Sequence, residues 1–241
     1  MTALPGVKAL VFDVFGTVVD WRSGVARDAR IFLARHGKAD IDPHVFADAW
    51  RKRYQPAMEE VRSGRRPFTR LDVLHWENLD LVLRDHGIDP ASIAAGELDW
   101  LNRAWHRLDP WPDTIPGLIR LRAKHFLAPL SNGNILLLAN MAKRAGIPWD
   151  AVLGAEAARA YKPQPEAYLR TADILGLQPS EVALVAAHNG DLAAARKAGL
   201  KTAFVLRPTE HGPNQTTDTR AEQDWEAVAS SFEELADRLG C

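Results

Sequence analysis

The sequence predicts an α/β fold in which a doubly wound parallel sheet forms the core and a helical segment is inserted near its start. After residue 112, short apolar runs alternate with helix-period segments, which is typical of parallel strands joined by helices. Residues 21–111 instead show helix-period segments and no convincing strand. We therefore expect a core domain made of residues 1–20 and 112–241, and a helical cap domain made of residues 21–111.

The core elements are predicted from apolar runs and from the residues that punctuate them. VKALVFDV (7–14) is apolar, rich in β-formers and flanked by Gly6 and Gly16, as expected of a buried parallel strand. Further strands are expected over 126–132, 151–155, 181–187 and 201–206, with helices over 134–146, 165–176, 190–199 and 231–239. Residues 207–226 contain prolines and a glycine and are expected to form an irregular loop.

Four helices are expected in the insert, because apolar residues recur there at helical spacing. The first ends at Gly37, the second follows Pro43, the third ends at Gly87, and the fourth spans about 93–108.

Composition excludes several classes of protein. The 241 residues are 46% hydrophobic and 25% charged with a net charge of -1, which excludes a disordered chain and gives no electrostatic reason to expect nucleic acid or an anionic membrane as partner. The one cysteine, Cys241, allows no internal disulfide. The N-terminus lacks the layout of a signal peptide, and no apolar stretch is long enough to span a bilayer, so we expect a cytoplasmic location.

Polar residues follow four of the predicted strands, at the sheet edge where ligands gather in open α/β folds. They are Asp13 and Thr17 in DVFGT, Ser131 and Asn132 in SNGN, Lys162 in YKP, and His188, Asn189 and Asp191 in AAHNGD. In a functional interpretation, Asp13 is presented to a cleft, Thr17 orients it, and Lys162 keeps it ionised. The alternatives are structural: a turn aspartate, helix caps, a solvated lysine and a satisfied loop histidine.

The order and spacing of these four loops resemble the four motifs of the haloacid dehalogenase superfamily along nearly the whole chain. The resemblance implies a Rossmann-like core, a cap inserted after the first motif, and Asp13 as a nucleophile. Most members are Mg²⁺-dependent phosphatases with a second Asp two positions after the nucleophile, where this chain has Phe15. The Gly-Asp pair expected in the fourth motif is Ala186-Ala187 here, which leaves a poor oxygen cage for Mg²⁺.

The sequence looks more like the type II L-2-haloacid dehalogenase branch, which needs no metal or other cofactor. That branch has an aromatic at the position of Phe15 and a Trp-Arg pair in the cap, matched here by Trp50 and Arg51. The resemblance implies that Asp13 forms an ester with a short 2-haloacid, releasing halide, and that water then releases a hydroxy acid. A solvated basic helix face is the alternative for Arg51.

The same resemblance assigns roles to the other residues. Arg51 and Asn132 hold the halide, with Phe15 beside them; Thr17, Ser131, Lys162 and Asp191 position Asp13 and the water; Tyr168 is a further site residue, for which core packing is the alternative. His188 and Asn189 are expected to contact substrate. The branch has Ser and Asn where this chain has Ala186 and His188, which leaves room for a different preference, including haloacetates and fluoroacetate.

Two other functions stay open. One is a phosphatase acting on a small phosphorylated metabolite, which a Mg²⁺ requirement would reveal. The other is a catalytically silent relative that only binds a small acid or a partner protein. The resemblance also implies a possible homodimer.

Overall fold

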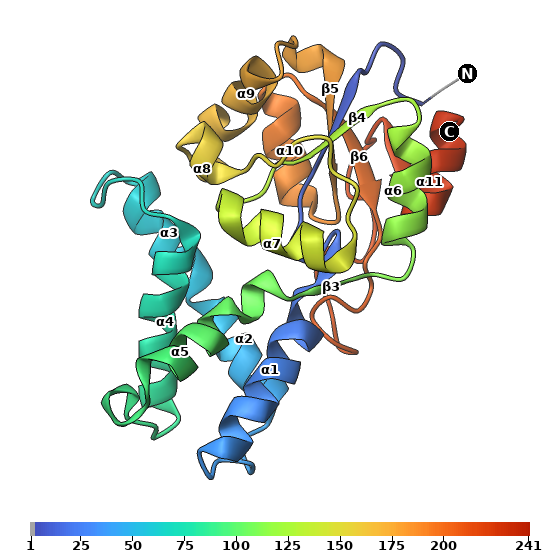
Figure 1. The fold of residues 1–241 in the computed structure, drawn as a ribbon. Helices are drawn as coiled ribbons and strands as arrows, with labels where there is room; N and C mark the ends of the chain where they lie inside the picture. Colours follow the sequence, from blue (N-terminus) through green and yellow to red (C-terminus); the bar gives the residue numbers. More distant parts are fainter. Residues whose placement is uncertain (1–2) are drawn as a thin grey trace.

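The computed structural model describes residues 3–241, and its centre is a five-stranded parallel sheet (Figure 1). The strand order is β4-β1-β5-β6-β7, and every neighbouring pair is parallel. The strands are β1 (Ala9–Phe12), β4 (Phe126–Pro129), β5 (Val182–Ala186), β6 (Lys201–Val205) and β7 (Ala227–Ala229). The predicted α/β fold with a parallel sheet is therefore confirmed.

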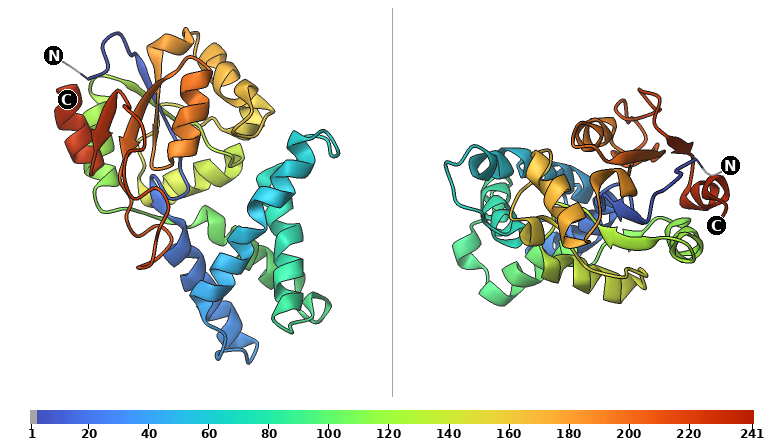
Figure 2. Two further views of the ribbon diagram at one scale, coloured as in Figure 1. Left: turned by 180° about the vertical axis from the view of Figure 1, so that it is seen from behind. Right: turned by 90° about the horizontal axis from the view of Figure 1, so that it is seen from above.

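Helices cover both faces of this sheet (Figure 2). Successive side chains of β1 point to opposite faces, so Leu10 and Phe12 join one hydrophobic cluster and Ala9 and Val11 join another. The first cluster includes residues of α6 (Thr114–Arg122), α7 (Ile135–Ala145) and α11 (Phe232–Leu239); the second includes residues of α9 (Pro165–Ile174) and α10 (Asn189–Lys197). Burial on both faces explains why the strand sequence is continuously apolar.

The inserted segment is helical, and it lies at the end of the sheet where the chain leaves β1 (Figure 1). Its elements are α1 (Trp21–Arg35), α2 (Pro43–Lys52), α3 (Tyr54–Arg62), α4 (Leu71–Asp85) and α5 (Ala95–Asn102), with 3₁₀ turns η1 (Pro90–Ser92) and η2 (Arg103–His106). A short antiparallel pair, β2 (Val19–Asp20) and β3 (Asp109–Pro110), joins the two ends of the insert.

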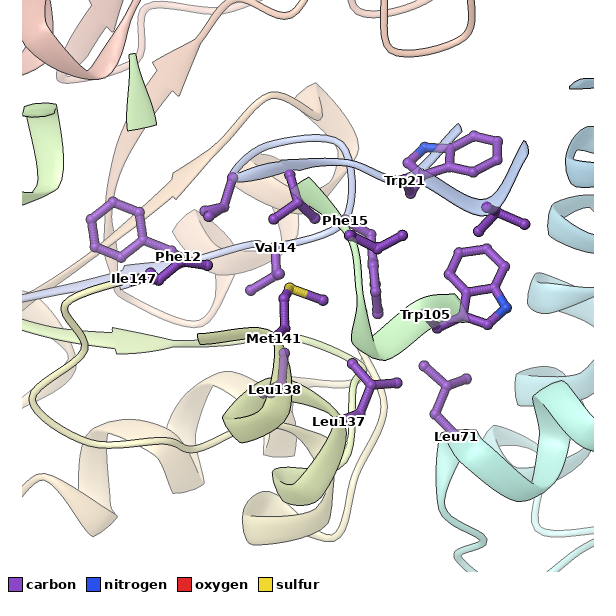
Figure 3. Close-up of a cluster of buried hydrophobic side chains, with 14 of the residues drawn as sticks. Phe12, Val14, Phe15, Trp21, Leu71, Trp105, Leu137, Leu138, Met141 and Ile147 are labelled. Carbon is purple, nitrogen blue, oxygen red and sulfur yellow. The ribbon is translucent and has the colours of Figure 1, made fainter. Parts of the chain in front are cut away.

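One hydrophobic cluster continues from the sheet into the insert (Figure 3). Phe12 and Val14 come from the end of β1, Met141 comes from α7, and Trp21 and Trp105 come from the insert. All five side chains are at most 2% exposed. The insert is thus packed against the core by apolar contact, which fixes the position of its residues over the end of the sheet.

One predicted strand is wrong. Residues 151–154 form an irregular connection, and α8 (Ala155–Ala158) follows. The connection contacts the neighbouring β4 region at its ends, where Asp150 N donates to Leu127 O and Ala155 N donates to Ser131 O (both 2.8 Å). Gly154 has a φ of 127° and lies so close to the Gly133 carbonyl that a Cβ atom would come within 2.6 Å of its oxygen. That backbone departs from a regular strand.

Other boundaries differ in smaller ways. The predicted second insert helix is two helices, α2 and α3, which meet at Arg53, and the fourth is α5 between two 3₁₀ turns. Strand β7, helix α6 and the β2–β3 pair were not predicted. Within residues 3–241, no helix is both long enough and apolar enough to cross a membrane.

Candidate active site

Strand β1 carries Asp13 to the middle of the sheet edge. The Asp13 amide still pairs with the neighbouring strand, donating to Val185 O at 3.0 Å. The chain then turns at Gly16, whose φ of 89° is unfavourable for other residues. The side chain of Asp13 is therefore held at the carboxyl end of a central strand and is only 7% exposed.

Both carboxylate oxygens of Asp13 accept hydrogen bonds from core residues. Oδ1 accepts from Lys162 Nζ at 2.8 Å, and Oδ2 accepts from Thr17 Oγ1 at 2.7 Å and from His188 Nδ1 at 3.0 Å. Burial by itself would raise the pKa of Asp13, but Lys162 and His188 outweigh it and hold the pKa well below its usual range. Asp13 is therefore a buried, ionised carboxylate, as a nucleophile requires.

Lys162 links Asp13 to a second carboxylate. Its ammonium also contacts Asp191, whose Oδ1 accepts from the Tyr168 hydroxyl at 2.6 Å. Burial opposes the charge of Lys162, yet the two carboxylates raise its pKa above the usual value. Burial and the charge of Asp191 raise the pKa of Tyr168, so this phenol stays a donor. The predicted neighbourhood of Asp13, Thr17, Lys162 and Asp191 is thus present in one cluster.

A cavity of about 630 Å³ opens between this cluster and the insert. From the core it is lined by Asp13, Phe15, Asn132, Lys162, Pro163, His188, Gly190, Asp191, Glu210 and His211, and from the insert by Arg51, Lys52, Tyr54, Gln55 and Arg62. The Asn132 side chain is fixed in this wall because its Oδ1 accepts from the Lys162 amide at 2.8 Å. The side of the cavity formed by the core is thus polar, and the side formed by the insert is largely cationic.

Arg51 is held over this cavity by aromatic rings. Its guanidinium carbon lies 4.0 Å from the Tyr54 ring centre, 5.2 Å from Trp21 and 5.8 Å from Phe15. Its Nη1 is buried and has no hydrogen-bond partner among the described residues. A buried cationic donor without a partner is unfavourable, so this atom is suited to receive an anion.

The structure does not bring three of the predicted substrate-binding side chains to the cavity. Ser131 Oγ accepts from Gly133 N at 3.1 Å within its own turn, and Tyr168 lies behind Asp191. Asn189 faces the loop after β6: its Oδ1 accepts from Trp225 Nε1 at 3.0 Å, and its Nδ2 donates to Asp218 Oδ1 at 2.9 Å. Each of these side chains supports neighbouring protein, so we assign it no direct contact with substrate.

Glu210 is a site residue that sequence reasoning missed. Its Oε2 lies 2.8 Å from His188 Nε2, its Oε1 accepts from Trp21 Nε1 at 3.0 Å, and the residue is 1% exposed. A Cβ atom at Gly16 would come within 2.1 Å of its carboxyl group, so the first turn must be glycine to admit it. One signal was available: Glu210 follows the predicted strand 201–206, at the edge where the other site residues gather.

The parallel α/β core presents a buried, lysine-paired aspartate beneath a helical insert, an arrangement that suits a carboxylate nucleophile. Residues 7–199 match the family model of the haloacid dehalogenase-like hydrolases. The chain belongs to this family.

Similar proteins narrow the class further. The chain is 30% identical to (S)-2-haloacid dehalogenase 4A of Burkholderia cepacia over 83% of this chain and 84% of that protein. It is 54% identical to the crystal structure of a defluorinating L-2-haloacid dehalogenase, with a TM-score of 0.96 and 98% of each chain covered. A second L-2-haloacid dehalogenase structure is 44% identical, with a TM-score of 0.92 over 97% of this chain and 99% of that one.

The residues around Asp13 do not fit Mg²⁺, the ion that most members of the superfamily use. All four carboxylate oxygens of Asp13 and Asp191 already accept hydrogen bonds from Lys162 or from neighbouring hydroxyl and imidazole groups. Ala187 offers no side-chain oxygen at the position where the sequence resemblance places the aspartate of the Gly-Asp pair. Among residues 3–241, no group of three or more His, Cys, Asp or Glu side chains is placed to hold a metal ion.

Proposed function

We propose that this protein is a hydrolytic dehalogenase of short 2-haloacids that works through an ester on Asp13 and needs no metal. One observation carries the proposal: a buried Asp13 carboxylate, paired with Lys162, faces a cavity into which Arg51 presents an unpartnered donor. This arrangement supports Asp13 as the nucleophile and Arg51 as the receptor for the leaving anion. The haloacid dehalogenase names of the relatives support the same chemistry.

In the first step, one oxygen of Asp13 attacks the carbon that bears the halogen. A carbon–oxygen bond forms, the carbon–halogen bond breaks, and the halide leaves with the electron pair. Arg51 and Asn132 line the cavity and receive the halide, and the Phe15 side chain lines the same cavity. A halide needs no proton on leaving, which is consistent with a phenylalanine at the position where phosphatases of the family carry a general acid.

In the second step, water attacks the ester carbonyl of Asp13. The bond between the carbonyl carbon and the ester oxygen breaks, so a 2-hydroxy acid leaves and the Asp13 carboxylate is restored. Lys162 donates to Oδ1 of Asp13 and Thr17 donates to Oδ2, so a donor faces whichever oxygen remains the carbonyl, polarises it and stabilises the negative charge that develops there. The step releases one proton, which a base in the cavity must accept.

We extend the proposal to substrate, location and assembly. Haloacetates and L-2-haloalkanoates are the proposed substrates, with fluoroacetate among them because a 54% identical relative is defluorinating. Residues 21–111 act as the cap domain, and residues 1–20 with 112–241 act as the core domain. A cytoplasmic location is supported by the absence of internal disulfides, since Cys241 is the one cysteine. A homodimer is proposed from the resemblance alone.

A halide-release screen tests this function. We expect halide from at least one of fluoro-, chloro- and bromoacetate and the two 2-chloropropionate enantiomers, and none from Asp13→Asn, which keeps the shape of the side chain and removes its charge. A single turnover should increase the mass of Asp13 by the mass of the substrate acid less that of the hydrogen halide. Release of no halide from any of these substrates would contradict the proposal. Turnover that depends on Mg²⁺ and is abolished by EDTA would favour the alternative, a phosphatase.

A further inference from the structure

His188 lies between two carboxylates, and the proposed chemistry uses only one of them. Its Nδ1 is 3.0 Å from Asp13 Oδ2, and its Nε2 is 2.8 Å from Glu210 Oε2. Both residues line the cavity, and the His188 side chain is 23% exposed there. One ring therefore connects the nucleophile to a second buried acid.

Glu210 is held too firmly to be an incidental neighbour. It is 1% exposed, and its second oxygen accepts from the indole N–H of Trp21, the first residue of α1. The site admits this carboxyl group only because position 16 is glycine. A buried carboxylate is costly without partners, and the partners here include the ring that touches Asp13.

The ring's protonation depends on the state of Asp13. Burial would lower the pKa of His188, but Glu210 and Asp13 outweigh it and raise the pKa well above its ordinary value, so the resting ring carries both protons. When Asp13 becomes a neutral ester, one of these two anions is lost. The pKa of His188 then falls from its resting value while Glu210 continues to raise it, and a base forms when the ring releases its Nδ1 proton through the cavity to solvent.

We propose that Glu210 is a positioning residue for ester hydrolysis, because it holds the Nε2–H of His188 and so leaves Nδ1 directed at Asp13 as the base for water. Nδ1 takes one proton from the water as its oxygen bonds to the ester carbonyl. The second proton of that water passes to the departing ester oxygen, so the hydroxy acid leaves with its new hydroxyl group and the restored Asp13 carboxylate pairs with the protonated ring. The proton lost after esterification is the one that the overall reaction releases, so protons balance.

Glu210→Gln tests this inference, which rests on the proposed function. Glutamine keeps the shape but removes the negative charge that makes His188 more basic, so the halide burst of the first turnover should persist while ester hydrolysis slows about tenfold or more. The ester on Asp13 should then accumulate in the steady state and be visible by mass. Glu222→Gln is the matched control, because Glu222 is an exposed acid in the same loop, and it should behave as wild type.

The outcomes separate the two proposals. If wild type and Glu222→Gln release no halide, the proposed function fails. If both release halide and Glu210→Gln hydrolyses its ester at the wild-type rate, or loses both steps equally, the role of Glu210 is overturned.

A second measurement needs only wild type, in case Glu210→Gln does not fold. Ester decay in a single turnover should rise about tenfold per pH unit at low pH and then level, as one base is deprotonated. Besides Asp13 and Glu210, the charged groups near His188 are His211 from its own side of the cavity, Arg51 from the insert, and Lys162 with Asp191. Decay that does not change with pH would overturn the inference.

Discussion

His75 should make the stability of this protein depend on pH. Its ring is buried in the insert, stacked on Trp105 with centres 4.4 Å apart and close to Trp50 and Tyr54. Neither ring nitrogen has a hydrogen-bond partner within the described part of the chain. Burial, which outweighs the attraction of Asp72, lowers the pKa of His75 from 6.5 to about 3. The folded protein therefore keeps this ring neutral where the unfolded chain protonates it.

The sign and size of the effect follow from that shift. Above pH 6.5 the ring is neutral in both states and nothing is lost. Between pH 6.5 and 3 the unfolded state binds one more proton, so the free energy of unfolding falls by about 1.4 kcal/mol per pH unit from this group. At pH 4.5, two units below 6.5, the expected loss is about 3 kcal/mol.

His75→Phe isolates this contribution, because a phenylalanine ring can pack in the same position and cannot be protonated. Urea unfolding followed by tryptophan fluorescence should give free energies within about 1.5 kcal/mol of each other for the two proteins at pH 7.5. At pH 4.5 the variant should have gained about 3 kcal/mol relative to wild type. Equal pH dependence in the two proteins would refute the buried, neutral His75.

Two further substitutions test which residues contact substrate and which only stabilise the fold. Arg51→Lys keeps the charge but loses the planar group stacked on Tyr54, so kcat/KM for haloacid should fall about 10- to 100-fold with unfolding unchanged; an unaltered kcat/KM would contradict the anion site. Asn189→Ala leaves the buried Trp225 indole without its acceptor, so stability to urea should drop by about 1–3 kcal/mol while KM stays constant, and a raised KM would place Asn189 in the cavity.

The strands that are buried on both faces could be predicted from the sequence. A short apolar connection was mistaken for a strand, and a strand with few hydrogen-bonded neighbours was missed. β1 and β5 are continuously apolar because both of their faces are covered, and the sequence shows this directly. The segment 151–155 is equally apolar, but five residues carry too little periodicity to distinguish a strand from a packed connection. β7 (Ala227–Ala229) has three residues and one neighbour, β6, so its pairing depends on partners far away in the chain.

Some residues of the candidate site could likewise be predicted from the sequence, and others could not. Asp13, Lys162 and Asp191 could be predicted, because residues that follow parallel strands meet at one edge of the sheet. Glu210 could not be assigned its role from spacing, since its contacts with His188 and Trp21 join positions that lie 22 and 189 residues away. Whether a polar residue faces the cavity or the neighbouring loop also depends on packing.

The charges around the cavity favour attack on carbon over attack on phosphorus. Three carboxylates, those of Asp13, Asp191 and Glu210, are faced by Lys162, Arg51 and a protonated His188, so these six groups are close to neutral without a metal. Lys52 and Arg62 also line the cavity and add positive charge from the insert. A phosphate ester would bring up to two more negative charges against the Asp13 carboxylate. A haloacid brings one, on its own carboxylate, and displacement only moves the charge of Asp13 to the halide. Arg51 already offers a free donor on the wall of the cavity, so no further cation is required.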